Sequence, residues 1–224
     1  MPYTLAFDVY GTLIDTNGVV ATLEDVVGEC AAEVSRIWRE KQLEYSFRRG
    51  LMGAYRDFSV CTHQALNYAL AVHDLVLQEA QHARLLDSYT KLPAFGDVRE
   101  ALEVLRRDRH RLFAFSNGRA DAVEGLLRHA GIVDFFDGIV SVDEINTFKP
   151  DAAVYQHFLT RCQIQARDAW LVSGNSFDVL GAINADWNAI WVQRSEHSRL
   201  DPWDITPTAT VTDLVQISDI LGRH

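Results

Sequence analysis

Short apolar runs alternate with helical segments along most of this chain, and this alternation constrains the fold more than any other feature. The runs predicted to be strands are residues 5–8, 112–115, 135–141, 169–172, 189–192 and, more weakly, 209–211. Strands that alternate with helices form a parallel sheet with right-handed crossover connections. The sequence therefore predicts an α/β fold with a Rossmann-like parallel sheet core. Asp97 and Thr212 are expected to cap two of its helices.

A long segment without a strand-like run, residues 17–92, interrupts this alternation. Its apolar residues follow helical spacing, first in one amphipathic helix over residues 23–38 and then in further helical stretches. A turn-forming sequence at residues 93–97 ends the segment. We therefore predict an all-helical cap, residues 17–92, inserted into a core domain made of residues 1–16 and 93–224.

Charge and composition exclude several classes of partner. The 224 residues carry a formal net charge of −10 and no basic run, so nucleic acids and anionic membrane surfaces are poor partners. No stretch reaches the roughly 18 apolar residues that span a bilayer, and the N-terminus lacks a signal pattern. The three cysteines are scattered and lack metal-ligand spacing, as expected of free thiols in a reducing compartment. We therefore expect a cytoplasmic protein.

Polar side chains follow the predicted strands at their carboxyl ends. Asp8 ends the first strand, and Gly11 and Thr12 form a turn after it. The polar residues after the second and fourth strands are Ser116, Asn117, Ser173, Asn175 and Asp178. Lys149 comes from a loop just before a helix. Ligands of open α/β sheets bind beyond the carboxyl ends of the strands, so we expect these side chains to converge.

Two carboxylates near one cation suggest a nucleophilic carboxylate. Lys149 would keep Asp8 ionised at neutral pH, and Asp8 could then attack a substrate and form a covalent ester. A nearby base must activate the water that releases this ester, and Asp178 is the candidate. It would act directly or in a network with Lys149, Ser173 and Asn175.

The order of strand-Asp, strand-Ser, Lys-Pro and Asn-x-x-Asp resembles the haloacid dehalogenase superfamily across essentially the whole chain. Most phosphatases of that superfamily carry D-x-D, in which the second Asp is a general acid and the first helps to hold Mg²⁺. This chain has D-x-Y-G-T-L, with Tyr10 in place of the second Asp. A halide leaving group needs no proton. The resemblance therefore implies cleavage of a carbon–halogen bond without a metal or cofactor.

Within the superfamily, the chain resembles the L-2-haloacid dehalogenases. Residues 38–45, W-R-E-K-Q-L-E-Y, match that family's W-R-x-K-Q-L-E-Y signature. The residues that this resemblance implies to be catalytic are Asp8, Thr12, Arg39, Lys149, Ser173, Asn175 and Asp178. Those that it implies to bind or surround the substrate are Tyr10, Leu43, Phe58, Ser116, Asn117, Tyr155 and Phe177.

The resemblance also implies a two-step mechanism. The substrate carboxylate docks on Ser116 and nearby backbone N–H groups. Asp8 then attacks C2 in line, with inversion, while Arg39 stabilises the departing halide. Water directed by Asp178 hydrolyses the ester, so that an L-2-haloacid gives a D-2-hydroxy acid. The cap would close the site and keep it dry.

Three positions depart from the family's pattern. Phe177 stands where Trp is common, which should reshape the pocket near the C2 substituent, and Gly174 is smaller than the frequent Ser or Thr. Glu40 stands where Gln is frequent. Because neighbouring positions on a helix point about 100° apart, we expect Glu40 to face away from Arg39.

The residues leave other functions open. A related hydrolase that opens a strained 2-carboxylate ring, such as azetidine-2-carboxylate, would use the same nucleophile and pocket. A Mg²⁺-dependent phosphatase of the same superfamily is disfavoured by Tyr10. A non-catalytic binding module is disfavoured by the joint presence of Asp8, Arg39, Lys149 and Asp178. The expected partners are a small 2-haloacid and the released halide, and the apolar surface of the cap could support a homodimer.

Overall fold

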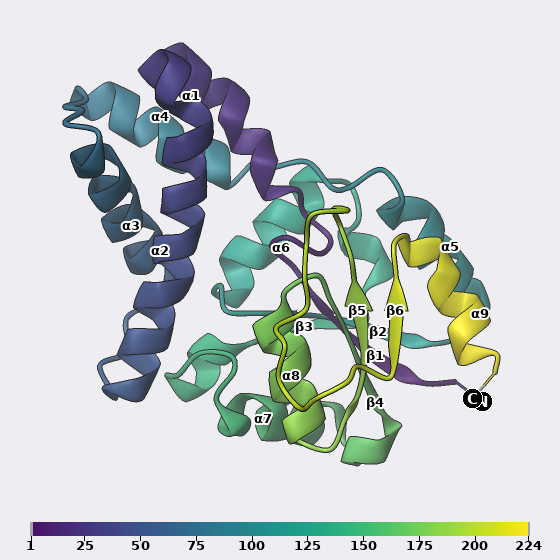
Figure 1. The fold of residues 1–224 in the computed structure, drawn as a ribbon. Coiled ribbons are helices and arrows are strands. Elements are labelled where there is room, and N and C mark those ends of the chain that lie inside the picture. Colours follow the sequence, from purple (N-terminus) through teal and green to yellow (C-terminus); the bar gives the residue numbers. More distant parts are fainter. Residues whose placement is uncertain (1, 224) are drawn as a thin grey trace.

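A six-stranded parallel sheet forms the centre of the structure, a computed structural model that describes residues 2–223. Its strands are β1 (Thr4–Asp8), β2 (Arg111–Ser116), β3 (Gly138–Ser141), β4 (Ala169–Ser173), β5 (Asn188–Val192) and β6 (Ala209–Val211). They lie in the order β3-β2-β1-β4-β5-β6, and every neighbouring pair is parallel (Figure 1). The predicted α/β core is therefore confirmed, with β1 at the centre of the sheet.

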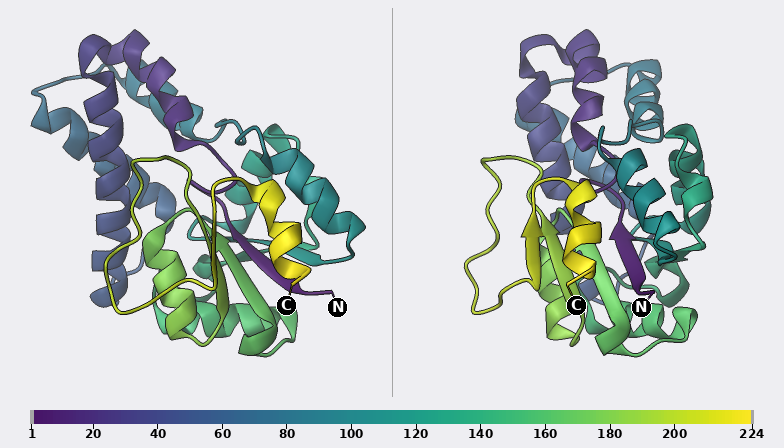
Figure 2. Two further views of the ribbon diagram at one scale, coloured as in Figure 1. Left: turned by 45° about the vertical axis from the view of Figure 1, so that its right-hand side comes forward. Right: turned by 90° about the vertical axis from the view of Figure 1, so that its right-hand side faces the viewer.

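Helices cover both faces of this sheet (Figure 2). They are α5 (Val98–Arg107), α6 (Ala120–His129), α7 (Ala152–Cys162), α8 (Ser176–Asn184) and α9 (Ile217–Leu221). Successive residues of a strand point to opposite faces, so Leu5 and Phe7 pack with α5, α6 and α9, whereas Ala6 packs with α7 and α8. Both faces of β1 are thus buried, and the strand holds its terminal carboxylate, Asp8, in a rigid frame.

The segment between β1 and α5 is helical, as predicted. It contains a short 3-10 helix (Thr16–Val19), α1 (Val20–Val27), α2 (Ala31–Leu51), α3 (Phe58–Val72) and α4 (Glu79–Tyr89). The single helix predicted over residues 23–38 is wrong, because Gly28, with a φ of 64°, ends α1 and α2 then continues to Leu51. Figure 1 shows these helices standing to one side of the sheet. The division of the chain into two domains stays a prediction.

The two linkers that join the helical segment to the sheet lie side by side. Ile14 forms isolated bridges with Tyr10 and Ala94. The Asp15 N–H donates to the carbonyl oxygen of Pro93 (2.9 Å), and the Phe95 N–H donates to that of Leu13 (3.0 Å). The loop that follows Asp8 is therefore also the root of the helical segment.

Several predicted details differ. The third strand starts at Gly138 rather than residue 135, because residues 133–135 form a 3-10 turn. The last helix begins at Ile217, after a 3-10 turn that Asp213, and not Thr212, caps. Asp97 precedes α5, but its carboxylate binds a distant arginine instead of capping the helix. Across residues 2–223, no helix combines the length and the apolar character that crossing a bilayer requires.

Candidate active site

Asp8 lies at the carboxyl end of the central strand and is 7% exposed. A tight loop follows it, in which the Val9 carbonyl oxygen accepts from the N–H groups of Leu13 and Ile14 at 3.0 Å. Gly11 has a φ of 81°, which L residues with a Cβ rarely adopt, so this turn requires glycine. The loop brings the Thr12 hydroxyl to 2.7 Å from Asp8 Oδ2.

The two oxygens of the Asp8 carboxylate have different surroundings. Oδ2 accepts hydrogen bonds from Thr12 Oγ1 (2.7 Å), Ser173 Oγ (3.3 Å) and Asn175 Nδ2 (2.7 Å). In the described part of the chain, Oδ1 accepts only one hydrogen bond, from Lys149 Nζ at 3.3 Å. Three donors therefore hold Oδ2 in place, whereas Oδ1 keeps an available lone pair.

Lys149 links this carboxylate to a second one. Its side chain is 1% exposed, and Nζ donates to Asp178 Oδ2 at 2.7 Å and to the Phe115 carbonyl oxygen at 2.8 Å. On the other side of Asp178, the Tyr155 hydroxyl donates to Oδ1 at 2.9 Å. Tyr155 is itself fully buried, which raises its pKa and keeps it a neutral donor. Tyr155 thus binds the Asp178 oxygen that Lys149 does not contact, and it orients this carboxylate.

Burial raises the pKa of Asp178 to about 6. The Lys149 ammonium opposes this rise, and the charge of Asp8 adds to it. A carboxylate whose pKa is close to neutral can take up a proton from water and later release it, so Asp178 has the properties of a general base at this site.

Arg39, on α2, contacts two residues that lie next to Asp8 in the site. Its Nη2 donates to the Tyr10 carbonyl oxygen at 3.3 Å and to Asn175 Oδ1 at 3.5 Å. Its Nη1 is buried and has no hydrogen-bond partner among residues 2–223. An unsatisfied buried donor is costly, and a charged one more so, so this nitrogen calls for an acceptor such as an anion. As expected, Glu40 faces elsewhere and pairs with Arg36.

Ser116 is the last residue of β2, and Asn117 follows it, next to the loop that carries Lys149. Ser116 Oγ accepts from the Gly118 N–H at 3.1 Å, and Asn117 Oδ1 accepts from the Lys149 backbone N–H at 2.9 Å. Both side chains are almost fully buried. Asn117 therefore fixes the loop that carries Lys149, a contact that the sequence pattern did not indicate.

Aromatic side chains wall the site on the side of α3 and α4. The Tyr10 ring lies 5.9 Å from that of Tyr89, in a stacked arrangement, and 6.2 Å from that of Phe58. Tyr10, Phe58 and Tyr89, together with Thr62 and Gly118, line a pocket of about 310 Å³. Burial raises the pKa of Tyr10, so its phenol stays neutral.

Leu43 and Phe177 were also predicted to line the substrate pocket. Leu43 is half-buried on α2, one turn after Arg39 and therefore on the same side of that helix. Phe177 packs edge-on against Phe47 at 5.0 Å and lines a groove next to Lys149. The fold thus brings Phe177 between α2 and the loop of Lys149.

Gly174 stands where the family's pattern has a larger residue, and the structure gives a steric reason for the glycine. A Cβ at this position would lie 2.4 Å from the carbonyl oxygen of Gly11, closer than any real contact. The close approach lets the Gly174 N–H donate to Thr12 Oγ1 at 2.8 Å.

Arg194 and Tyr89 also contact site residues, and neither was predicted. Arg194 lies two residues after β5, and its guanidinium binds the Thr12 carbonyl oxygen. The sequence could have indicated Arg194, because it is a cation just after the carboxyl end of a predicted strand. Tyr89 had no such signal, because it belongs to a helical segment whose position relative to the sheet was unknown.

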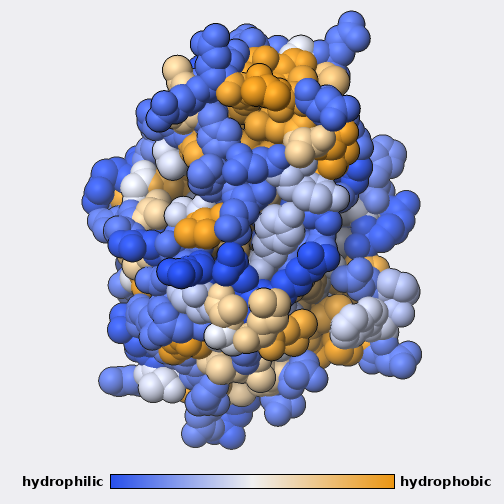
Figure 3. All heavy atoms as spheres, turned by 90° about the vertical axis from the view of Figure 1, so that its left-hand side faces the viewer, coloured by the Kyte–Doolittle hydropathy of each residue, from blue (hydrophilic) through white to orange (hydrophobic). Residues whose placement is uncertain are grey.

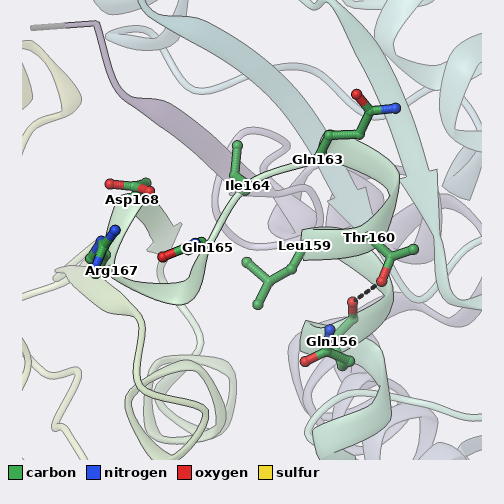
Figure 4. A pocket seen from close by; sticks show the side chains of 8 residues that line it. All are labelled: Gln156, Leu159, Thr160, Gln163, Ile164, Gln165, Arg167 and Asp168. Atoms are coloured by element: carbon green, nitrogen blue, oxygen red, sulfur yellow. Dashed lines mark hydrogen bonds between the residues drawn. The ribbon is translucent and has the colours of Figure 1, made fainter.

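Another pocket, of about 490 Å³, is lined by residues away from Asp8 (Figure 4). It is formed by the end of α7 and the turn before β4, including Leu159, Gln163 and Asp168. This is the amino end of β4, and Asp8 lies at the opposite edge of the sheet. The pocket contains none of the predicted site residues.

The residues around Asp8 do not fit the Mg²⁺ that related phosphatases use. Lys149 Nζ already bridges the carboxylates of Asp8 and Asp178. The Tyr10 carbonyl oxygen accepts from Arg39 and from Asn175 Nδ2. A divalent cation here would have to displace these cationic and amide donors from its oxygen ligands.

The fold and site together define a class of α/β proteins with a Rossmann-like parallel sheet and a buried aspartate at the tip of the first strand. A family model of haloacid dehalogenase-like hydrolases matches residues 4–186. The (S)-2-haloacid dehalogenase 1 of Pseudomonas sp. (strain CBS-3) is 38% identical over 188 residues, 84% of this chain and 83% of that protein. The (S)-2-haloacid dehalogenase of Pseudomonas fluorescens is 34% identical over 215 residues, 96% and 94% of the two chains.

A solved structure shows the same likeness. The L-2-haloacid dehalogenase from Xanthobacter autotrophicus with chloropropionic acid covalently bound superposes with a TM-score of 0.93, at 28% identity and 99% coverage of both chains. The chain therefore belongs to the L-2-haloacid dehalogenase family of the haloacid dehalogenase-like hydrolases.

Proposed function

We propose that this protein hydrolyses short L-2-haloalkanoic acids to D-2-hydroxy acids through an ester on Asp8. The observation that carries the proposal is Nη1 of Arg39, which is buried without a hydrogen-bond partner among residues 2–223 and belongs to a guanidinium that contacts Asn175, one of the donors to Asp8. The relatives named (S)-2-haloacid dehalogenase support it, as does the related structure with covalently bound chloropropionic acid.

In the first step, Asp8 Oδ1 attacks C2 of the substrate. Its available lone pair forms the new C–O bond while the carbon–halogen bond breaks on the opposite side, and C2 inverts. The halide leaves with the bonding electrons and is received by Arg39 Nη1. The substrate carboxylate would bind at Ser116 and the backbone N–H groups that follow β2.

In the second step, water attacks the carbonyl carbon of the Asp8 ester. Oδ2 is then the carbonyl oxygen, and negative charge develops on it. Donors already lie at 2.7–3.3 Å from Oδ2, so they form an oxyanion hole without rearranging. Asp178 takes one proton of the water and passes it to the departing 2-hydroxy acid oxygen. The second proton of the water stays on the new Asp8 carboxyl group and is then released to solvent, which restores the carboxylate, so each turnover yields one halide and one proton.

Halide release tests this function directly. Purified protein should release chloride from L-2-chloropropionate and form D-lactate, with D-2-chloropropionate a poor substrate and a chelator without effect. The stereochemistry follows from inversion at C2, because water attacks the aspartyl carbonyl carbon and not C2. Absence of halide from every small 2-haloacid, with ring opening of azetidine-2-carboxylate, would instead assign the site to the alternative hydrolase.

Arg39→Gln should lower kcat/KM for halide release by about 10²- to 10³-fold, the usual cost of losing one preorganised charge-stabilising group. Arg39→Lys should lie in between, because an ammonium keeps the charge but not the fork of donors. Arg36→Gln is the matched control, one turn earlier on α2 and exposed. Steady-state halide release by the three variants makes the comparison. Equal activity of Arg39→Gln and Arg36→Gln would contradict the role given to Arg39.

The predicted homodimer and the cytoplasmic location stay predictions. Figure 3 shows that hydrophobic patches interrupt the hydrophilic surface on the face that carries the helical segment. Large apolar side chains exposed in that segment are Leu51, Met52, Tyr68, Val72 and Val76. Such a surface supports the proposal that a second copy of the chain packs there.

A further inference from the structure

Arg194 ties the loop after Asp8 to the linker that precedes α5. Its Nε and Nη2 donate to the Thr12 carbonyl oxygen at 3.1 and 2.6 Å, and its Nη1 donates to Asp97 Oδ2 at 2.7 Å. The guanidinium lies 4.2 Å from the centre of the Phe95 ring. The side chains of Arg194 and Asp97 are 13% and 12% exposed, so solvent screens this ion pair little.

The group held by Arg194 is the backbone of Thr12, whose hydroxyl binds Asp8. A hydroxyl has a single proton to donate. Thr12 Oγ1 accepts from the Gly174 N–H at 2.8 Å, which leaves its proton directed at Asp8 Oδ2, 2.7 Å away. Two contacts therefore orient the Thr12 hydroxyl: the Gly174 N–H binds its oxygen atom, and Arg194 binds the backbone carbonyl oxygen of the same residue.

We propose that Arg194 is a positioning residue for the second chemical step, the hydrolysis of the ester. Arg194 contacts neither substrate nor Asp8. It acts through Thr12, one of the donors to the oxygen on which charge develops during hydrolysis. The inference rests on the proposed function, because it presupposes an ester on Asp8.

The two steps depend differently on this donor. During ester formation, charge leaves the Asp8 carboxylate, so a hydrogen bond to Oδ2 stabilises the starting state at least as much as the transition state. During hydrolysis, charge returns to Oδ2, so the same hydrogen bond stabilises the transition state more than the ester. A misplaced Thr12 hydroxyl should therefore slow hydrolysis and leave ester formation almost unchanged.

A second ion pair, with a similar hydrogen-bond pattern but more exposed, provides the control for a purely structural role. Arg106 Nη1 donates to Asp137 Oδ2 at 2.7 Å, and Asp137 Oδ2 also accepts from a backbone N–H, that of Leu112 at 2.8 Å. Asp97 Oδ2 likewise accepts from the backbone N–H of Leu214 at 2.8 Å. The Arg106 pair links α5 to the sheet without touching the loop after Asp8.

The test compares the wild type with Arg194→Gln, Arg194→Lys and Arg106→Gln. Rapid mixing with L-2-chloropropionate measures halide release in the first turnover, and mass spectrometry of quenched samples measures ester on the Asp8 peptide. For Arg194→Gln we expect ester hydrolysis to slow by about tenfold or more, with halide release in the first turnover changed by less than about threefold. The ester should then accumulate at steady state, and Arg194→Lys should recover part of the hydrolysis rate.

Arg106→Gln should leave both rates unchanged at a temperature where it is folded. Asp97→Asn is the second variant, for use if Arg194→Gln does not fold. It keeps Arg194 but weakens the ion pair that holds it, so ester hydrolysis should again slow more than ester formation, by a smaller factor. Equal slowing of both steps, or no ester accumulation in any variant of the Arg194–Asp97 pair, would overturn the inference alone. A wild-type enzyme that forms no ester and releases no halide would instead overturn the proposed function, and the inference with it.

Discussion

Asp8→Asn should abolish halide release, with a loss of about 10⁴-fold or more in kcat/KM. An amide at this position lacks the anionic lone pair of Oδ1, and it also disturbs the contact with Lys149 at 3.3 Å. No mass shift should be trapped on the peptide that contains residue 8. Halide release by ion chromatography and mass spectrometry of the quenched protein provide the two measurements.

Asp15→Asn is the matched control for this substitution. Asp15 lies in the same linker, and its side chain accepts from the Asn17 N–H at 2.9 Å without contacting Asp8. It should retain activity close to that of the wild type. Halide release by Asp8→Asn at more than about a hundredth of the wild-type rate would show that another group is the nucleophile.

Asp178→Asn should convert the enzyme into one that stops at the ester. Asp8 keeps its donors and the nearby Lys149 ammonium, so the first turnover proceeds and releases about one halide per protein molecule. Hydrolysis then lacks its base and should slow by about 10²- to 10⁴-fold. A burst of halide followed by a stable mass shift on the Asp8 peptide would be the direct evidence.

The pH dependence of ester hydrolysis follows from the pKa of Asp178. The base must be deprotonated, so the rate constant should be constant at high pH and fall about tenfold per pH unit on the acid side. The pKa is about 6 while Asp8 is ionised, and the charge of Asp8 is one cause of its rise above 3.8. Esterification removes that charge, so the midpoint for the intermediate should lie below pH 6.

Asp151→Asn is the control for both measurements, because the Asp151 side chain caps α7 through the Ala153 N–H and, among residues 2–223, forms no hydrogen bond or ion pair with Asp8 or Asp178. Its ester should decay as fast as that of the wild type. Continued turnover by Asp178→Asn without accumulation of ester would mean that the water is activated by another group, and the role of Asp178 would have to be withdrawn.

Much of the site followed from the sequence because strand ends have a fixed place in a parallel sheet. Asp8, Ser116 and Ser173 end three strands that are neighbours in the sheet order β2-β1-β4, and the structure brings them to one edge. Lys149 was predicted to join them from a loop before a helix, and its Nζ contacts the carboxylates of both Asp8 and Asp178. Apolar periodicity also located the helical segment, although it joined α1 to part of α2 across Gly28.

The roles of some residues depended on contacts between segments that lie far apart in the chain. Tyr155 was expected among the residues that bind or surround the substrate, and its hydroxyl donates to Asp178 Oδ1. Asn117 was expected among the substrate contacts, and it holds the Lys149 backbone. Neither position follows from local spacing, because a hydrogen bond between two loops depends on how both are packed.

The amino-acid sequence by itself determined the parallel sheet, the helical insertion and the carboxylate at the tip of the first strand, because these follow from residue periodicity and from local turn chemistry. Only the tertiary structure decided that Arg39 Nη2 reaches Asn175 beside Asp8 and that its Nη1 is buried without a hydrogen-bond partner within residues 2–223. It also decided that Arg194 holds the Thr12 backbone. The physical reason is that long cationic side chains are positioned by the packing of distant elements, and no local pattern encodes that packing.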